Sequence, residues 1–238
     1  MKQKRHRRRA PSSLAAPTQR EVAAAFRSLD SRAMGPVYCD EGGAAFWRAL
    51  RAPCRRMSER LAAALRARLR PGGRSLYAGA GVAEIAPLAM EALELEREVE
   101  PFNLRRAEVR FLARACRSLP FSFRAEDARR ARGRFDHLWL VSVLNDPEQV
   151  PELSALSYGR ANPVLFSPGR FAAERRETRA LADALLRKLF LPALVTTSVE
   201  ELVWVAEWCE KRRVPFRVED EEYPTALVGD PVRFVRLG

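Results

Sequence analysis

The chain has 238 residues, 47% of them hydrophobic, which is enough to bury the core of one sizeable domain and requires no second one. Its net charge is +12, and the basic residues within positions 1–9 supply half of it. No stretch is long and apolar enough to cross a membrane, so the composition excludes a helical membrane protein.

Residues 1–20 predict a disordered basic tail, because no acidic residue precedes Glu21 and because Pro11 and Pro17 with neighbouring serines are typical of a linker over positions 10–20. Two interpretations of its charge stay open: a solvated tail, or an arm that binds nucleic acid. We favour the first, since arginine and alanine are both abundant, as a GC-rich coding sequence would give. The tail faintly resembles an organellar transit peptide and fits a secretory signal less well.

Cysteine and histidine usage argues against a metal centre or a disulfide framework. The four cysteines show no Cys-x-x-Cys spacing, which predicts buried free thiols and a reducing cytoplasm. The two histidines, His6 and His137, are too few for a zinc or iron site, and His137 is expected to be a hydrogen-bonded core residue. The cysteines are Cys39, Cys54, Cys116 and Cys209.

A long amphipathic helix precedes the first predicted strand. Apolar residues recur every three or four positions from Trp47 to Leu69 with arginines between them, and Pro71, Gly72 and Gly73 end the pattern. Residues 21–73 are therefore predicted to form an N-terminal helical extension whose apolar stripe packs on a sheet.

The segment Leu76–Ala86 predicts a strand, a tight turn and a helix, because an apolar run breaks at Gly79 and Gly81 and continues into an alanine-rich helical pattern. Glycines at such a junction let the backbone turn sharply and bring its N–H groups close to a ligand at the positive end of a helix. This geometry is typical of a nucleotide-cofactor site, although a structural turn in a parallel sheet would use the same residues.

Strands and helices alternate after this turn. A second strand ends near Glu100, where a doubly wound fold puts an acid against a ribose. Helical spacing from Leu104 to Ala115 precedes a short strand at Phe121–Phe123, and the longest apolar strand runs from Phe135 to Leu144. The later elements are a helix over Phe171–Phe190, a strand over Leu194–Thr197, a capping box at Ser198–Glu201 that opens a helix through Cys209, and strands over Val214–Val218 and Ala226–Val235.

From about Ser75 to Leu237 these features resemble the class I S-adenosylmethionine-dependent methyltransferases. The resemblance implies an α/β fold over residues 74–238, with a Rossmann-like, doubly wound sheet of seven strands whose last strand is antiparallel. It also implies S-adenosylmethionine as the cofactor, held by the glycine turn at its methionine end, by Glu100 at the ribose and by Asp127 and Ala128 beside the adenine. The implied cofactor-binding residues are Tyr77, Gly79, Ala80, Gly81, Glu100, Pro101, Asp127, Ala128 and Ser142, and Phe46, Trp47 and Arg51 are candidates for a lid.

Two positions depart from the family pattern. Tyr77 stands where an acid two residues before the first glycine is common, and Ala83 stands where a third glycine is common. Glu84 argues against a nicotinamide dinucleotide, because its carboxylate would face a pyrophosphate. A P-loop is excluded because no Gly-Lys-Ser or Gly-Lys-Thr follows the glycines.

The chemistry is expected beyond the carboxyl end of the strand that begins at Phe135, since ligands of open α/β sheets bind there. Asp146, as a general base, and Asn145, as a hydrogen-bonding group, are the candidate catalytic residues. The run Asn145–Glu148 matches only in part the motif of enzymes that methylate amino groups of nucleic acids, and a turn initiated by Asn-Asp-Pro explains the same residues.

Methyl transfer from S-adenosylmethionine to an unidentified acceptor is the leading functional prediction. The alternative from another class is a methyltransferase-fold protein that has lost turnover and serves as an adaptor for nucleic acid or protein. An aminopropyltransferase relative is a second enzyme alternative, since Glu100 and Asp146–Pro147 fit it. Against it, the chain lacks that family's Asp-rich glycine motif and N-terminal β-hairpin domain, and a strongly basic protein is a poor host for a polyamine. Neither a metal nor a membrane is expected as a partner.

Overall fold

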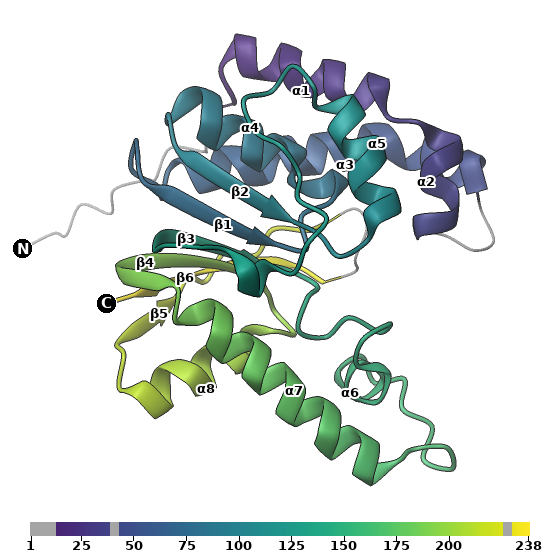
Figure 1. Ribbon diagram of the computed structural model, residues 1–238, viewed down its shortest axis with the longest axis vertical. Helices are drawn as coiled ribbons and strands as arrows, with labels where there is room; N and C mark the ends of the chain where they lie inside the picture. Colours follow the sequence, from purple (N-terminus) through teal and green to yellow (C-terminus); the bar gives the residue numbers. More distant parts are fainter. Residues whose placement is uncertain (1–12, 39–42, 226–229) are drawn as a thin grey trace, which may run out of the picture.

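The computed structural model describes residues 13–38, 43–225 and 230–238. In this part of the chain one sheet has the strand order β2-β1-β3-β4-β6-β5, with helices on both faces (Figure 1). The parallel strands are β1 (Arg74–Ala78), β2 (Glu98–Phe102), β3 (Phe135–Leu140) and β4 (Leu189–Ser198), and β6 (Val232–Leu237) runs antiparallel to β4 and to β5 (Phe216–Val218). The predicted α/β class and the antiparallel last strand are confirmed.

The strand predicted at Phe121–Phe123 is reduced to a single parallel bridge between Phe102 and Arg124, so the described sheet has six strands. The N–H of Arg124 donates to the carbonyl of Pro101 at 2.9 Å, and the N–H of Asn103 donates to the carbonyl of Arg124 at 3.0 Å. Phe123 is buried. The buried ring of Phe123 and the two backbone hydrogen bonds of Arg124 therefore hold this segment against β2, in place of a continuous strand ladder.

Two layers of helices cover the sheet, one above it and one below it in Figure 1. One layer contains α1 (Ala16–Ser28), α2 (Ser31–Tyr38), α3 (Gly43–Arg66), α4 (Ile85–Glu94) and α5 (Arg106–Ala115), and the other contains α6 (Pro151–Ser157), α7 (Pro168–Leu186) and α8 (Leu202–Arg212). Side chains alternate between the layers along each strand: Tyr77 and Trp139 lie in the first core, Leu76 and Leu138 in the second. Two 3-10 helices, η1 (Val82–Glu84) and η2 (Ala128–Arg130), lie in the connections.

The N-terminal helices belong to the first core. Trp47 and Leu61 on α3 are buried, while Arg56 and Arg60 are exposed, as the amphipathic pattern predicts. α1 begins at Ala16, so residues 16–20 are helical, although the sequence places them in a disordered linker. Pro17 fits there because the first turn of a helix does not use its N–H. Residues 1–12 of the predicted tail lie outside the described residues.

Further boundaries differ from the sequence prediction. The helix predicted over Phe171–Phe190 ends at Leu186, and Phe190 belongs to β4, which begins at Leu189 rather than at Leu194. β3 ends at Leu140, four residues before the predicted end, because the chain turns at Ser142 with φ 57°. The predicted capping box is absent, since Ser198 still belongs to β4 and α8 begins only at Leu202. Residues 226–229 of the last predicted strand lie outside the described residues.

A buried polar network crosses the first core between β1, β3 and α4. The hydroxyl of Tyr77 donates to Glu91 at 2.5 Å, and Nε of Arg97 donates to the other oxygen of the same carboxylate at 2.9 Å. Nδ1 of His137 lies 2.9 Å from Glu91, and its Nε2 lies 3.0 Å from the hydroxyl of Thr196. His137 is thus a hydrogen-bonded core histidine, as predicted.

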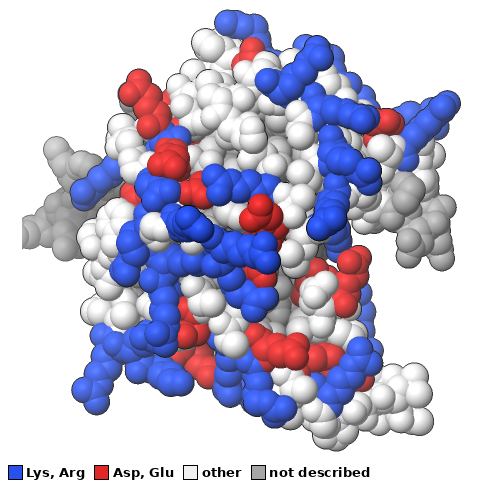
Figure 2. All heavy atoms as spheres, in the orientation of Figure 1, with Lys and Arg blue, Asp and Glu red and all other residues white. Residues whose placement is uncertain are grey.

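The described cysteines, Cys54, Cys116 and Cys209, are free and buried, and Cys39 lies outside the described residues. Within the described ranges, no helix combines the length and the apolar character that a membrane span needs. Figure 2 shows that basic side chains cover much of the visible face, with acidic side chains among them.

Candidate functional site

The glycine turn follows the carboxyl end of β1. Gly79 has φ 72°, in the left-handed region, and a Cβ on it would lie 2.6 Å from Cγ2 of Val143, so only glycine fits without displacement. The N–H of Ala80 donates to the carbonyl of Phe102 at 2.8 Å, and the side-chain amide of Asn103 donates to the carbonyl of Ala80 at 2.8 Å. The turn is therefore fixed to the end of β2.

Glu84 closes the turn from the side of the first core. Its Oε2 accepts a hydrogen bond from the N–H of Gly81 at 2.7 Å, and the residue is only 7% exposed. Burial raises the pKa of this carboxyl to about 7, although backbone N–H groups and the indole of Trp139 oppose the shift. The N–H that a pyrophosphate would need at this turn is occupied by an internal carboxylate, which supports the argument against a dinucleotide site.

Tyr77, predicted to contact the cofactor, points into the first core. Its ring is buried and stacks on Trp139 with the ring centroids 5.1 Å apart, and its hydroxyl is held by Glu91. Burial, followed by the charge of Glu91, raises the pKa of Tyr77 well above its usual value. Because this side chain belongs to the core network, only the backbone of Tyr77 is available to a ligand.

Glu100, predicted to bind a ribose, lies two residues before the end of β2, opposite Leu76. One carboxylate oxygen lies 2.6 Å from Arg74 and the other lies 3.1 Å from Arg124, so the charge is neutralised within the protein. The carbonyl of the predicted ligand Pro101 is also occupied, by Arg124. The residue at the carboxyl edge of β2 is instead Asn103, which the sequence analysis missed because an amide does not match the expected acid.

Asp127 and Ala128 follow the bridge at Arg124 and open η2. Asp127 accepts a hydrogen bond from the N–H of Arg129 at 2.8 Å and pairs with its guanidinium. Partial burial opposes the shift, but these bonds and the charge of Arg129 lower the pKa of Asp127. Ala128 is buried in the second core. Asp127 therefore acts as a cap of η2, three residues after the bridge to the carboxyl end of β2, and the chain then returns to the amino ends of β1 and β4, where Arg74 and Lys188 donate to the carbonyls of Arg132 and Ala131.

The turn after β3 is built around the buried carboxylate of Glu201, which precedes α8. The carboxylate accepts hydrogen bonds from the N–H groups of Ser142 at 2.8 Å, Val143 at 2.6 Å, Leu144, and Asn145 at 3.3 Å. The hydroxyl of Ser198 donates to it as well, at 3.0 Å. Burial raises the pKa of Glu201 despite these bonds. Glu201 was predicted to cap the helix that follows it. Its carboxylate instead holds the turn after β3, in which the sequence analysis placed the chemistry.

The two predicted catalytic residues have different environments. Asn145 is 1% exposed, its amide donates to the carbonyl of Glu200 at 3.2 Å, and its side-chain oxygen accepts from the indole of Trp204 at 3.2 Å. Its side chain therefore supports the turn and is not free for a substrate. The side chain of Asp146 is 22% exposed, and burial raises its pKa, opposed by the N–H of Glu148 and by the charge of Arg105.

The first turn of α5 meets this segment at the carboxyl edge of the sheet. Arg105 lies 2.9 Å from Glu148 and 4.0 Å from Asp146. Glu108 is 2% exposed, and burial together with the charge of Glu148 raises its pKa to about 8. The sequence analysis missed Glu108, because one acid inside a helical pattern gives no sign that it is buried. The structure thus brings Asp146, Glu148 and Glu108 together.

The candidate lid residues hold α3 in place. Trp47 is buried in the first core, and Arg51 donates to the carbonyl of Leu29 at 2.9 Å and to the hydroxyl of Ser31 at 2.6 Å. Phe46 is 36% exposed and contacts Trp47 edge to face. Of the three residues, only Phe46 has a side chain that could contact a ligand without breaking these contacts.

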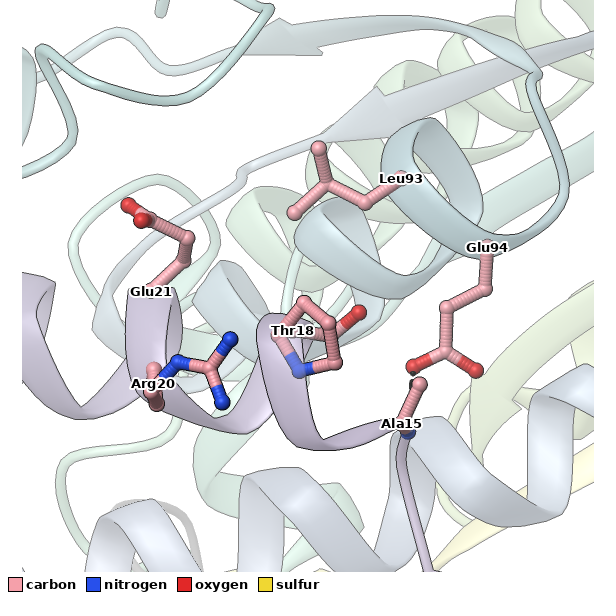
Figure 3. Close-up of a pocket in the computed structure, with 7 residues that line it drawn as sticks. Ala15, Thr18, Arg20, Glu21, Leu93 and Glu94 are labelled. Carbon is pink, nitrogen blue, oxygen red and sulfur yellow. Dashed lines mark hydrogen bonds between the residues drawn. The ribbon is translucent and has the colours of Figure 1, made fainter.

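A separate surface hollow of about 540 Å³ lies between α1 and α4 (Figure 3). Glu94 borders it and accepts a hydrogen bond from the N–H of Ala15 at 2.8 Å. Leu93 and Glu94 end α4, whose other end adjoins the glycine turn, so the hollow lies roughly 15 Å from that turn along the helix. It is not part of the site at the carboxyl edge. Among the described residues, no group of three or more His, Cys, Asp and Glu is arranged to hold a metal ion.

Comparison with known proteins identifies the fold. No protein-family profile matches this sequence, and no curated protein sequence matches it. Magnesium protoporphyrin IX methyltransferase (ChlM) from Synechocystis PCC 6803, crystallised with bound SAM, superposes with a TM-score of 0.52 and 12% identity, covering 95% of this chain and 100% of that one. The N-methyltransferase NodS from Bradyrhizobium japonicum WM9 gives a TM-score of 0.50 and 9% identity, covering 78% and 96%. This chain therefore shares the fold of these methyltransferases.

Proposed function

We propose that this protein, whose fold is that of class I S-adenosylmethionine-dependent methyltransferases, binds S-adenosylmethionine at the turn Gly79–Gly81 and transfers its methyl group to an acceptor beyond β3. The observation that carries the proposal is the hydrogen bond from Gly81 to the buried carboxylate of Glu84. An anionic pyrophosphate requires free N–H groups at such a turn and no carboxylate beside them. The positively charged ammonium group, which S-adenosylmethionine shares with S-adenosylhomocysteine, suits this carboxylate.

The polar groups around the turn support this cofactor. The hydroxyl of Ser142 is buried and has no hydrogen-bond partner among the described residues, so it is free for a polar group of a ligand. The side chain of Asn103 donates to the carbonyl of Ala80 and accepts from the N–H of Arg105, so it fixes the glycine turn and the start of α5 at the edge of β2, where a ribose would lie. Ser142 and Asn103 thus frame the turn on either side. Asp127 and Ala128, which follow the bridge to the carboxyl end of β2, are the proposed adenine contacts.

In the proposed reaction, the residues of this chain position the methyl acceptor and supply a group that takes up its proton. When bound, the cofactor supplies an electrophilic methyl group on a positively charged sulfur. The fixed turns at Gly79 and Ser142 align the acceptor with that group, which is the main source of rate in such a transfer. Asp146 takes up the proton that the acceptor releases as it gains the methyl group, and its raised pKa makes it a stronger base than an exposed aspartate.

Calorimetric titration with S-adenosylhomocysteine and with NAD tests the proposal. We expect the wild-type chain to bind S-adenosylhomocysteine and not NAD, and we expect Glu84→Gln to weaken that binding about tenfold, which corresponds to ~1.4 kcal/mol. A glutamine oxygen can still accept the Gly81 hydrogen bond, so the fold is retained. Glu210→Gln, an exposed change on α8, is the control and should bind like the wild type. Binding of NAD, or of neither ligand, would refute the proposal.

A further inference from the structure

One face of α5 carries a column of arginines. Arg106, Arg110 and Arg114 are spaced four residues apart, and Arg117 continues the column just past the helix. The first three lie about 6 Å apart along the helix and fall within about 80° around its axis, and Arg117 lies in the turn after the helix ends. All four side chains are exposed, while Val109, Phe111 and Leu112 cover the opposite face with the first core. Figure 2 shows basic side chains gathered over this part of the surface.

The arginine column has no counter-charge within the described residues. None of its four members forms an ion pair there, and the acid of α5, Glu108, is buried on the opposite face. Some arginines elsewhere are paired, such as Arg74 with Glu98 and Glu100, and others, such as Arg56 on α3 and Arg175 on α7, form no ion pair within the described residues. What distinguishes the column is therefore its spacing and its place beside the candidate site. Like charges four residues apart on a helix repel one another, so this arrangement is unfavourable for the isolated fold.

The helices packed beside α5 carry further exposed arginines. Arg20 and Arg27 on α1 and Arg32 on α2 are exposed, and α1 and α2 both pack on α5. The nearby acids are engaged locally. Glu21 accepts a hydrogen bond from Ser118, and Asp30 accepts from the N–H of Arg32 at the start of α2.

The arginine column leads to the candidate site. Arg106 begins α5 four residues after β2 ends, at the edge where Asn103 and the glycine turn lie. A ligand lying along the column would therefore have one end beside the proposed cofactor and the proton acceptor Asp146. Guanidinium groups bind phosphate in a fixed, bidentate geometry, and a row of them suits a chain of phosphates.

From this geometry we infer that the arginine column binds the phosphate backbone of a single strand of RNA and presents a nucleotide of that strand to the carboxyl edge of the sheet. The inference rests on the proposed function only where it names RNA as the class of methyl acceptor. The binding surface itself is independent of methyl transfer. It also differs from the predicted nucleic-acid arm at residues 1–9, because it lies on the folded part of the chain.

Fluorescence anisotropy with a labelled single-stranded 12-nucleotide RNA of mixed sequence tests the inference, using the full chain at several salt concentrations. Three variants are compared with the wild type. Arg106→Gln, Arg110→Gln and Arg114→Gln are combined in one protein. The matched control combines Arg175→Gln, Arg176→Gln and Arg217→Gln, which remove the same charge from α7 and β5. The third is Glu84→Gln. The N-terminal tail is present in every protein, so its contribution cancels.

We expect the α5 variant to bind the RNA at least tenfold more weakly, and the slope of log affinity against log salt to fall by about 2, since each phosphate contact on a single strand contributes about 0.7. The control should keep most of the affinity. Equal losses in the two triple variants, or stronger binding of duplex DNA, polyglutamate or anionic vesicles than of the RNA, would overturn the inference.

Titration of the same proteins with S-adenosylhomocysteine separates this inference from the proposed function. An α5 variant that still binds S-adenosylhomocysteine but loses RNA supports the arginine column and shows that the variant is folded. If no protein binds S-adenosylhomocysteine while the RNA result holds, the proposed function fails and the binding surface stands. If S-adenosylhomocysteine binds and the RNA does not, the inference fails alone.

Discussion

Glu91 on α4 and His137 on β3 lie 2.9 Å apart, from carboxylate to Nδ1, and neither side chain is exposed to solvent. Burial alone would raise the pKa of Glu91, but His137, Arg97 and Ser75 outweigh it and lower that pKa to about 2. The folded state therefore binds this proton less tightly than the unfolded state does. The resulting stabilisation is fully present above the ordinary value of 4.5 and is lost as the pH falls toward 2.

Replacement of Glu91 by glutamine should reduce the free energy of unfolding at pH 7 by about 3 kcal/mol, because the buried Arg97 loses one of its two counter-charges, Asp136 being the other, and His137 loses its carboxylate partner. Urea denaturation at pH 7 measures the change. Glu210→Gln, on the exposed side of α8, should change the same quantity by less than about 0.5 kcal/mol. Equal stabilities of the two variants would show that the network does not stabilise the fold.

Glu84 has the opposite pH dependence. Because burial raises its pKa to about 7, the folded state binds the proton more tightly, and the free energy of unfolding falls as the pH rises from 4.5 to 7. Glu84→Gln should flatten this part of the curve, by at most about 3 kcal/mol. Urea denaturation at half-unit steps between pH 4.5 and 8 gives the curve. Glu108→Gln should flatten it further toward pH 8, and a Glu84→Gln curve parallel to the wild type would contradict the assignment.

Gly79 and Gly159 form a matched pair for the glycine turn. Both have positive φ, 72° and 64°, but an added Cβ meets Val143 at 2.6 Å in the first case and nothing within 4 Å in the second. Gly159→Ala should cost about 1 kcal/mol from backbone strain alone. Gly79→Ala should cost about 3 kcal/mol because overpacking adds to that strain, which corresponds to a fall in Tm of about 6–12 °C by scanning calorimetry. Val143→Ala should restore part of the loss in Gly79→Ala and none in Gly159→Ala.

Substitutions of Asp146 and Asn145 should have different effects: the first should lower the rate of methyl transfer, and the second should lower the stability of the fold. Asp146→Asn should lower transfer of tritiated methyl groups from S-adenosylmethionine to bulk RNA by about 10²-fold or more, with Tm unchanged, because it removes a proton acceptor. Asn145→Ala should instead lower stability by about 2 kcal/mol, because it leaves the buried indole N–H of Trp204 without a partner. An Asp146→Asn protein that transfers methyl groups at the wild-type rate would remove Asp146 from the mechanism.

The sequence predicts the architecture here because local patterns determine it. The break at Gly79 and Gly81 follows from backbone conformation, and the apolar run from Phe135 follows from burial of a central strand on both faces. These signals need only neighbouring residues. The same patterns indicated the α/β class, whereas the antiparallel last strand, which the structure confirms, was implied only by the resemblance to class I methyltransferases.

The roles of individual polar residues depended on partners far away in the chain. Glu100 lies in the predicted strand, but Arg74, 26 residues earlier, neutralises it. Glu201 has the spacing of a helix cap, yet its carboxylate holds a turn almost 60 residues upstream. Asn145 has the position of a substrate ligand but contacts Trp204. No local pattern encodes such pairings, so sequence alone could propose an edge of the sheet for the site and could not assign each side chain in it.

The short bridge at Arg124 affects the tendency of this protein to aggregate through the β2 edge of its sheet. An exposed edge strand can recruit the edge of another chain and begin aggregation. β2 would be such an edge, but Arg124 already occupies the carbonyl of Pro101 and the N–H of Asn103, and proline has no N–H to offer. The guanidinium groups of Arg74 and Arg124 also flank this margin. A docking β-strand would meet blocked hydrogen-bonding groups and positive charge, so this edge resists pairing with another chain at high concentration.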